Sequence, residues 1–486
     1  MSDASELIYE LDDNPSRKES FFAAIQHVLA SFIGIITPTL IIGGVLGLGE
    51  EIPYLISMAL MVSGVGTIIQ AKKPMGIGAG MICVQGTSFA FLSSVLAAGF
   101  IAKANGGGPD QILSLIFGVC VLGAFVEIAV SQFLEKLKRV VTPVVTGTVI
   151  TVIGISLIKV GFTDLAGGQW LLTNKPELFA SFDNLFLGVL VMASIIVAHK
   201  YGNQWVRLSS IIIGMLVGMA AAVLMGKVNY SAIGNVETLI SIPVPFKYGF
   251  SFDLAAFIPV ALIYLITAIE TSGDITANCM VSKQPISGAS YLKRIKQGIL
   301  GDGVNSLIAG IFNTFPNTTF SQNNGVIQLT GIASRFIGVW IGMILIVMGL
   351  FPHIGALFRA VPNSVLGGAT IIMFATVAMA GVKILTHVEL NRKNMLTLAV
   401  SFGMGLGVLL VPQVVNTVAA NIGGDLGAIV KSIFGSPITA SGLTVVFLTL
   451  FLGEYPEQYN PIIQEFPIDE EMSKQVKVKP SIKGIN

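Results

Sequence analysis

The stretch FNTFPNTTFSQNNGVIQLTG at residues 312–331 decides the fold of this chain. It lies among apolar segments, yet it carries Asn, Thr, Ser and Gln where a simple membrane anchor would carry Leu and Val. Such side chains are costly in hydrocarbon unless they are paired, so they indicate a broken helix that faces a ligand or water. Pro316 and Gly325 allow an extended piece followed by a half-helix starting near Gln322, whose free N–H groups can donate to a partly negative ligand atom.

The composition of the whole chain points to lipid as its solvent. Of 486 residues, 53% are hydrophobic and 11% are charged, whereas a soluble globular chain carries roughly 25% charged residues. The net charge of +1 argues against a nucleic-acid partner. The polar, acidic residues 1–20 lack the features of a secretory signal, so we expect a cytoplasmic N-terminus. The sequence therefore predicts an all-α integral membrane protein.

Crossing the hydrocarbon core takes about 20 apolar residues, and about fourteen segments are long enough or nearly so. We place them at 21–48, 53–71, 82–99, 111–134, 141–160, 184–199, 207–226, 254–282, 297–313, 322–332, 333–351, 363–383, 394–411 and 426–452. Polar residues and glycines interrupt 82–99 and 322–332, which we interpret as two broken helices. With this map most Lys and Arg residues, including those of the 283–296 linker, lie inside with both termini, as the positive-inside rule requires.

Two pairs of short motifs suggest an internal repeat. GTSF at 86–89 resembles NTTF at 317–320, about half the chain away, and PVVTG at 143–147 resembles PNSVLGG at 362–368 at a similar offset. Together they predict two halves of seven spans. An odd number of crossings inverts the second half relative to the first, an arrangement common in secondary transporters. The binding site is then expected at mid-membrane between the paired broken helices.

Ionisable side chains inside the membrane need a functional reason, because each costs about 2.5–3.5 kcal/mol at the centre of a spanning helix. Glu270 and Asp274 in ETSGDITAN are four residues apart and so share one helix face. Asp302 lies in GDGVNS on the following span. We expect these three acids to be functional. Glu127, near the cytoplasmic end of its span, is interpreted instead as structural.

Gln322 opens the predicted half-helix, and its amide offers donors and an acceptor in fixed directions, which suits the edge of a heterocycle. His27 is the one histidine in a mid-helix setting, and both a structural role and a role in a proton network stay open for it. Cys83, Cys120 and Cys279 lie far apart without metal-ligand spacing, so we interpret them as small apolar side chains. Neither a metal nor a cofactor is expected.

At QNNGVIQLTG (322–331) and ETSGDITAN (270–278) the sequence resembles the nucleobase/ascorbate transporter family, also called nucleobase:cation symporter family 2. The resemblance runs from about residue 20 to about residue 452. Within the family it is nearest to the bacterial xanthine permeases, because Gln322 and Asn323 open the signature where uracil permeases carry a glutamate. The resemblance implies fourteen helices in a seven-plus-seven inverted repeat, a homodimer, and a multi-pass protein of the bacterial inner membrane.

The resemblance also implies a division into two domains that move against each other. The core domain is expected at 21–135 and 254–351, and the gate domain at 141–226 and 363–452. The remaining segments, 1–20 and 454–486, are expected to be cytoplasmic tails.

Site residues follow from the same resemblance, position by position. Glu270 and Gln322 are expected to hydrogen-bond the base, with Ser88, Phe89 and Ser321 lining the pocket. The positions linked to proton coupling and support of the site are Asp302, Asp274, His27 and Asn323. Some xanthine permeases carry Asn where this chain has Ser88, so uric acid is a further expected substrate.

The function expected from the sequence is therefore proton-coupled import of a purine base, most of all xanthine, by alternating access. A permease for uracil or another nucleobase of the same family is the nearest alternative. An anion exchanger or channel of the same architecture would instead favour basic residues at the broken helices. A membrane-embedded enzyme lacks support, because the chain shows no metal-spaced His cluster and no nucleophile with a base.

Overall fold

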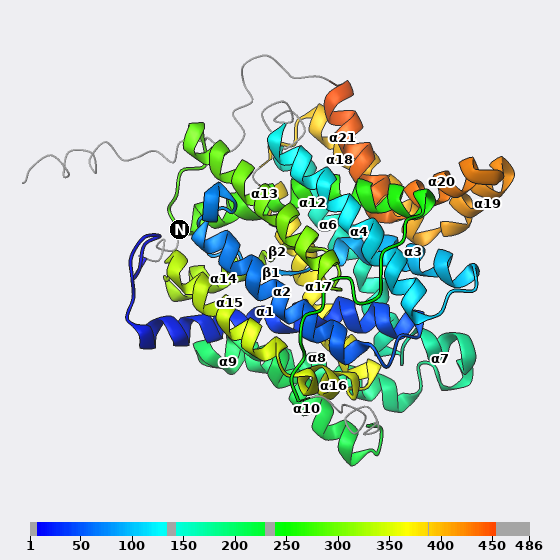
Figure 1. Ribbon diagram of the computed structural model, residues 1–486, viewed down its shortest axis with the longest axis horizontal. Helices are drawn as coiled ribbons and strands as arrows, with labels where there is room; N and C mark the ends of the chain where they lie inside the picture. Colours follow the sequence, from blue (N-terminus) through cyan, green and yellow to red (C-terminus); the bar gives the residue numbers. More distant parts are fainter. Residues whose placement is uncertain (1–6, 134–141, 229–238, 387, 453–486) are drawn as a thin grey trace, which may run out of the picture.

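The computed structural model describes residues 7–133, 142–228, 239–386 and 388–452. These residues are mostly helical, and the helices pack into one bundle with two short strands inside it (Figure 1). The elements are α1 (Arg17–Leu46), α2 (Ile52–Lys72), η1 (Pro74–Gly76), β1 (Gln85–Thr87), η2 (Phe89–Phe91), α3 (Leu92–Ala104), α4 (Pro109–Gln132), α6 (Pro143–Leu165), α7 (Gln169–Asn174), η3 (Pro176–Leu178), α8 (Phe182–Tyr201), α9 (Gln204–Leu208), α10 (Ser210–Leu224), α12 (Leu254–Val281), α13 (Gly288–Ile311), β2 (Asn317–Thr319), α14 (Gln322–Thr330), α15 (Arg335–Gly349), α16 (Pro352–Arg359), α17 (Asn363–Leu385), α18 (Arg392–Leu410), α19 (Pro412–Ile422), α20 (Gly424–Phe434) and α21 (Pro437–Phe451).

Within the described ranges, eight helices are long and apolar enough to cross a membrane, and α15 with α16 forms a further candidate bent by 75°. Each of the fourteen spans expected from the sequence overlaps a helix of the structure. The membrane helices and the helical fold are thus confirmed, whereas the exact number of crossings stays a prediction. The expected C-terminal tail 454–486 and the basic loop before residue 142 lie outside the described residues.

Two segments differ from the expected spans. The segment 426–452 is divided into α20 and α21, because Pro437 occupies the first turn of α21 and cannot continue a preceding helix. Helix α13 begins at Gly288, well before the expected 297. A search for apolar runs misses such polar helical turns, since helical hydrogen bonds form in water as well as in lipid.

The two segments interpreted as broken helices meet inside the bundle. Strands β1 and β2 pair antiparallel, with Gln85 opposite Thr319 and Thr87 opposite Asn317. Each strand leads into helical residues, η2 with α3 after β1 and α14 after β2. Helix α14 begins at Gln322, as the sequence predicted. The related motifs GTSF and NTTF therefore lie side by side.

The second pair of motifs also lies in helices that touch. Helices α6 and α17, which begin at Pro143 and Asn363, pack closely along each other. A Cβ added to Gly154 would lie 2.3 Å from the Ala378 nitrogen, so a larger residue at Gly154 would push the two helices apart.

The polar segment before α1 is partly ordered. Ser16 caps α1 in a capping box with Glu19, so the helix begins at Arg17 rather than at 21. Upstream of the cap, Tyr9 forms a parallel bridge with Ile332, and Asp12 pairs with Arg335 at 2.8 Å. The N-terminal segment therefore lies against the loop between α14 and α15, on the face of the bundle where α14 ends.

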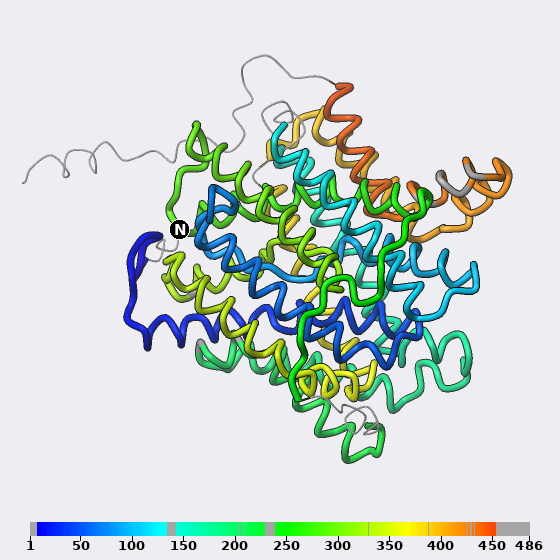
Figure 2. The backbone as a smooth tube through the Cα atoms, in the orientation of Figure 1, coloured from blue at the N-terminus to red at the C-terminus, as the bar shows by residue number. Residues whose placement is uncertain are grey.

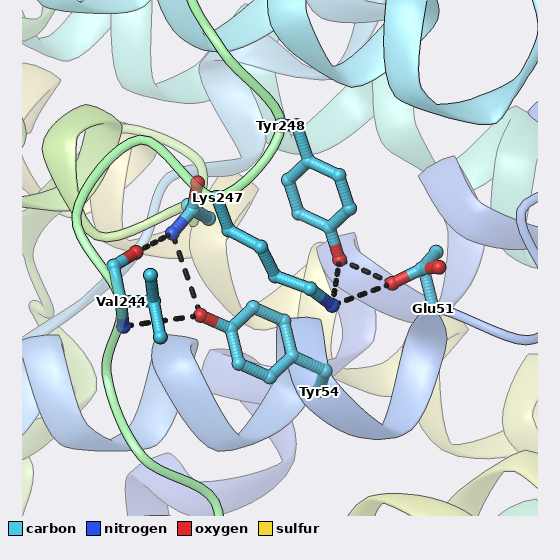
Figure 3. A network of polar contacts seen from close by, with 6 residues as sticks. Glu51, Tyr54, Val244, Lys247 and Tyr248 are labelled. Carbon is cyan, nitrogen blue, oxygen red and sulfur yellow. Dashed lines mark hydrogen bonds and ion pairs between the residues drawn. The ribbon is translucent and has the colours of Figure 1, made fainter.

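An extended connection over residues 239–253 crosses the outside of the bundle before α12, and it is the green, non-helical stretch of the tube in Figure 2. The ammonium of Lys247 lies 4.0 Å from the ring centre of Tyr54 and 3.1 Å from the Glu51 carboxylate (Figure 3). Tyr248 also donates to Glu51, and burial together with that carboxylate raises the pKa of Tyr248. These contacts hold the connection against the start of α2.

Candidate functional site

Both half-helices start from the same two-stranded sheet. The backbone nitrogen of Ser88 donates to the Pro316 carbonyl at 2.8 Å, and that of Phe320 donates to the Val84 carbonyl at 2.9 Å. Ser88 and Phe89 therefore follow β1 where the chain comes off the sheet, as Ser321 follows β2. The structure thus places the two segments expected to line the pocket next to each other, in the middle of the bundle.

Asp302 is fully buried, and both of its carboxyl oxygens accept hydrogen bonds. Its Oδ1 accepts from Gln70 Nε2 at 2.7 Å and from Gln85 Nε2 at 2.6 Å. Its Oδ2 accepts from the hydroxyl of Thr271 and from the backbone nitrogen of Thr319 at 3.2 Å. Because all these groups donate, the site suits an ionised carboxylate that ties α2, α12, α13 and both strands together.

Glu270 differs from Asp302, because one oxygen of its buried carboxyl group accepts no hydrogen bond. It is 9% exposed, and among the described residues its Oε2 has no hydrogen-bond partner. The buried hydroxyl of Ser88 likewise has no hydrogen-bond partner among the described residues. The residue after Glu270, Thr271, donates to Asp302, so this turn of α12 lies beside the strands. An unpaired buried polar group costs about 1–3 kcal/mol, which indicates that a ligand or water completes these atoms.

His27 on α1 is joined to the half-helix α14. The amide nitrogen of Asn323 lies 3.1 Å from His27 Nδ1 and 3.4 Å from the His27 carbonyl. An amide nitrogen only donates, so Nδ1 accepts and a neutral imidazole carries its proton on Nε2. His27 therefore fixes the second residue of α14, which supports the position of its neighbour Gln322.

Gln322 is half-buried at the start of α14, against a glycine of α1. A Cβ added to Gly34 would lie 3.3 Å from Gln322 Nε2 and 2.9 Å from the Phe320 ring. The same ring would lie 2.3 Å from a Cβ on Gly86 of β1. Two glycines thus make room for the ring of Phe320, and one of them also borders the Gln322 amide.

The sequence predicts uptake of xanthine, and Gly34→Ala is expected to reduce that uptake about tenfold while the protein still reaches the membrane, because overpacking by one methyl costs roughly 1–3 kcal/mol. Gly44→Ala is the matched control on the same helix, since a Cβ there meets no atom within 4 Å. Labelled-xanthine uptake, normalised to protein in the membrane, measures the effect. Equal uptake by the two variants would show that Gly34 does not shape the site.

A cavity of about 250 Å³ opens between α12 and α14 on one side and α6 and α17 on the other. Of the nine expected site residues, Asp274 and Ser321 line it; the other seven are not among its lining residues. Asn324 also lines the cavity, and its amide donates to the Asp274 carbonyl at 3.2 Å. The cavity is thus a space beside the start of α14, and it faces α6 and α17, the helices of the second motif pair.

Sequence reasoning missed the residues that hold Asp302, which are Gln70, Gln85, Thr271 and Thr319. Gln70 and Gln85 are fully buried amides in apolar surroundings. A signal existed, because a glutamine inside a spanning segment is costly without a partner. Which acid each amide pairs with is set by the packing of α2 on α13 and is not visible in the sequence.

Comparison with known proteins identifies relatives along nearly the whole chain. A family model described as "Permease family" matches residues 18–414. The xanthine permease XanP of Escherichia coli (strain K12) is 40% identical over 92% of this chain and 94% of its own length. The xanthine permease XanQ of the same strain is 41% identical over 93% and 96%. The uric acid permease PucJ of Bacillus subtilis (strain 168) is 33% identical over 89% and 92%.

Among solved structures, the fold resembles the transmembrane domain of the cyanobacterial bicarbonate transporter BicA, with a TM-score of 0.53 and 16% identity over 90% of this chain and 99% of that one. It also resembles SLC26A9, with a TM-score of 0.57 and 12% identity over 90% and 66%. At these identities the likeness concerns the fold alone. On the family match and the identity to the permeases, the chain belongs to the nucleobase/ascorbate transporter family.

Proposed function

We propose that the protein imports a purine base, xanthine above all, together with a proton across the bacterial inner membrane. The observation that carries this proposal is the unpaired acceptor of Glu270 beside the paired half-helices. The names of the relatives support it, since two are xanthine permeases and one is a uric acid permease.

The site suits the edges of a planar heterocycle. Xanthine carries N–H and C=O groups around its rings, so Glu270 accepts from a ring N–H while the Gln322 amide donates to a carbonyl and accepts from a neighbouring N–H. Phe89 supplies an aromatic face, and Ser88 and Ser321 border the base. The free Ser88 hydroxyl also offers a donor for the extra carbonyl of uric acid.

We propose fourteen crossings in a seven-plus-seven inverted repeat, and the pairing of helices supports it. Helix α4 packs on α13 as α15 packs on α2, and α8 packs on α10 as α18 packs on α21. Each of these contacts has its counterpart in the other half. Core and gate domains follow at the predicted boundaries, and the cavity between α12 with α14 and α6 with α17 lies between those domains. Assembly as a homodimer is part of the proposal.

Proton coupling supplies the driving force in this scheme. Each proton that crosses 100 mV releases about 2.3 kcal/mol, which supports a roughly fifty-fold gradient of a neutral solute. A carboxyl that gains a proton with the base also avoids moving as an ion through the membrane. The acids near the strands are the groups available for this step.

Uptake of labelled bases into cells that lack their own permeases tests the proposed function. We expect concentrative uptake of xanthine that a protonophore abolishes. Uptake of bicarbonate or another inorganic anion, without uptake of any base, would overturn the assignment in favour of an anion transporter.

The orientation is tested by cysteine labelling, since the charge pattern places the 283–296 linker inside. Ser287 is exposed, and the Ser287→Cys variant is expected to react with a membrane-impermeant thiol reagent only after the cells are opened. Thr173 is exposed on the opposite side of the map, so Thr173→Cys should react in intact cells. The three native cysteines are buried and free, so their background is low. Labelling of the Ser287→Cys variant from outside would contradict the inverted-repeat map.

Asp302→Asn is expected to impair accumulation of xanthine much more than its binding. One oxygen of Asp302 would become an NH₂ group, which cannot accept from the backbone N–H of Thr319 or from the side-chain amide of Gln70. One of these donors would then lack an acceptor, at a cost of about 1–3 kcal/mol. The substitution also removes the negative charge of Asp302 that acts on Glu270 and on Glu127. Binding to purified protein and accumulation in vesicles, measured side by side, check this. An equal loss of both would refute a separate role in coupling.

A further inference from the structure

Glu127 on α4 is a buried acid that the site described so far does not use. It is 1% exposed, and among the described residues neither of its carboxyl oxygens has a hydrogen-bond partner. Asp302, equally buried, has donors on both oxygens. A structural carboxyl buried in a bundle is normally paired, so the two unpaired oxygens of Glu127 require an explanation.

Glu127 lies beside the site rather than at a distance from it. Helix α4 packs on both α12 and α13. A Cβ added to Gly303, the residue after Asp302, would lie 3.0 Å from the Ile128 nitrogen and 3.5 Å from the carbonyl carbon of Glu127. The backbone of α4 at Glu127 therefore touches α13 at the level of Asp302.

The groups around Glu127 are acids and neutral side chains. Helix α13 contributes the charge of Asp302, and α12 contributes that of Glu270 together with the phenol of Tyr264. Cys120 lies two turns earlier on α4 itself. Helix α3, which also packs on α4, carries Lys103 as its one basic residue, exposed at the far end. Helix α13 also carries Lys293, Arg294 and Lys296, all in its first turns, before Asp302.

The hydroxyl that acts on Glu127 belongs to Thr267 on α12, and it is shared with a backbone carbonyl. Thr267 donates to the Tyr264 carbonyl at 3.2 Å, and Tyr264 donates to the Cys120 carbonyl at 3.0 Å. A hydroxyl has a single proton, so the Thr267 hydroxyl cannot serve the Tyr264 carbonyl and Glu127 fully at the same time. Glu127 thus lacks the set of donors that both oxygens of Asp302 have.

We propose that Glu127 is a proton-binding site of the transport cycle, which takes up and releases a proton while Asp302 keeps its hydrogen-bonded carboxylate. The proposal rests on the proton coupling proposed above. The proton comes from water outside, forms an O–H bond on the Glu127 carboxylate, and leaves to water on the cytoplasmic side. Gln132, the last residue of α4, is five positions after Glu127, about 8 Å along the helix. The acid thus lies near the predicted cytoplasmic exit.

This role differs from that of the groups at the base. Asp302 is held by donors and stays charged, whereas neither oxygen of Glu127 has a hydrogen-bond partner among the described residues, and Glu127 exchanges its proton. A purely structural neutral acid would be replaced by Gln without loss, because the Gln amide is neutral, nearly the same size, and also offers one donor and one acceptor. The Gln variant therefore separates proton exchange from packing.

The experiment compares Glu127→Gln with the wild type in vesicles that contain the purified protein. Exchange of labelled for unlabelled xanthine, which needs no net proton movement, is expected to stay within about twofold, while accumulation under a proton gradient falls from roughly fifty-fold to about onefold. Glu177→Gln, the same change at an exposed position outside the site, should leave both unchanged. Wild-type accumulation by Glu127→Gln would overturn the proposal, and so would loss of exchange together with accumulation.

Two further measurements test whether Glu127 binds a proton even if Glu127→Gln does not fold. Xanthine added to wild-type protein in weakly buffered solution is expected to cause proton uptake, and Glu127→Gln should reduce it. If Glu127→Gln fails to fold, Glu127→Asp decides: a shifted pH dependence of uptake supports the proposal and an unchanged one overturns it. A wild-type protein that moves xanthine without any response to proton gradients would refute proton coupling itself, which is a different failure.

Discussion

Glu270→Gln is expected to weaken xanthine binding by more than about a hundredfold, because it removes the charged acceptor that faces a ring N–H. The side chain is buried, its Oε2 has no partner among the described residues, and Gln is nearly the same size. Packing is thus preserved and only the hydrogen-bond chemistry changes: an NH₂ group at that oxygen would oppose the N–H of the base. Direct binding to purified protein, for example by calorimetry, measures the loss.

The control for this variant is Glu51→Gln, the same change in the contacts that hold the 239–253 connection (Figure 3). It should bind xanthine like the wild type even if its thermal stability falls. Wild-type affinity in Glu270→Gln would remove this residue from the base site.

Gln322→Glu is expected to reduce xanthine transport about five-fold to more than a hundred-fold, although size and shape barely change. The amide both donates and accepts, whereas an ionised glutamate only accepts. The donor to the ring carbonyl is lost and that carbonyl meets a negative charge, which costs about 1–3 kcal/mol for the missing bond alone.

Uptake of xanthine and of uracil, measured in parallel, reads out this change. The family resemblance of the sequence implies a glutamate at this position in uracil permeases, so the ratio of xanthine to uracil uptake should fall in Gln322→Glu. Gln169→Glu, at an exposed position, is the matched control for the added charge. Unchanged xanthine uptake in Gln322→Glu would show that the Gln322 amide does not recognise the base through hydrogen bonds.

Much of the fold followed from the sequence because its two main signals are local. Apolar length marks the spanning helices, and polar residues inside an apolar run mark a break, so the interruption of both segments and the start of α14 at Gln322 were predictable. The motif pairs indicated which segments correspond, and the structure places GTSF against NTTF in one sheet.

The pairing of side chains was not predictable, because it depends on contacts between distant helices. Asp302 and Glu270 look alike in the sequence, as two acids in apolar helices. Only the packing of α2 and β1 against α13 gives Asp302 its donors and leaves Glu270 without one on Oε2. Glu127 was interpreted as structural from its place near a helix end, yet it has no hydrogen-bond partner among the described residues and lies level with Asp302.

Competition for uptake tests the central claim, recognition of an oxidised purine, most directly. Cells that lack their own permeases and express this protein take up labelled xanthine in the presence of unlabelled bases in excess. We expect unlabelled xanthine to block uptake, uric acid to compete through Ser88, and uracil to compete weakly or not at all. Uptake of uracil in preference to xanthine would contradict the account, while leaving the fold and the family unchanged.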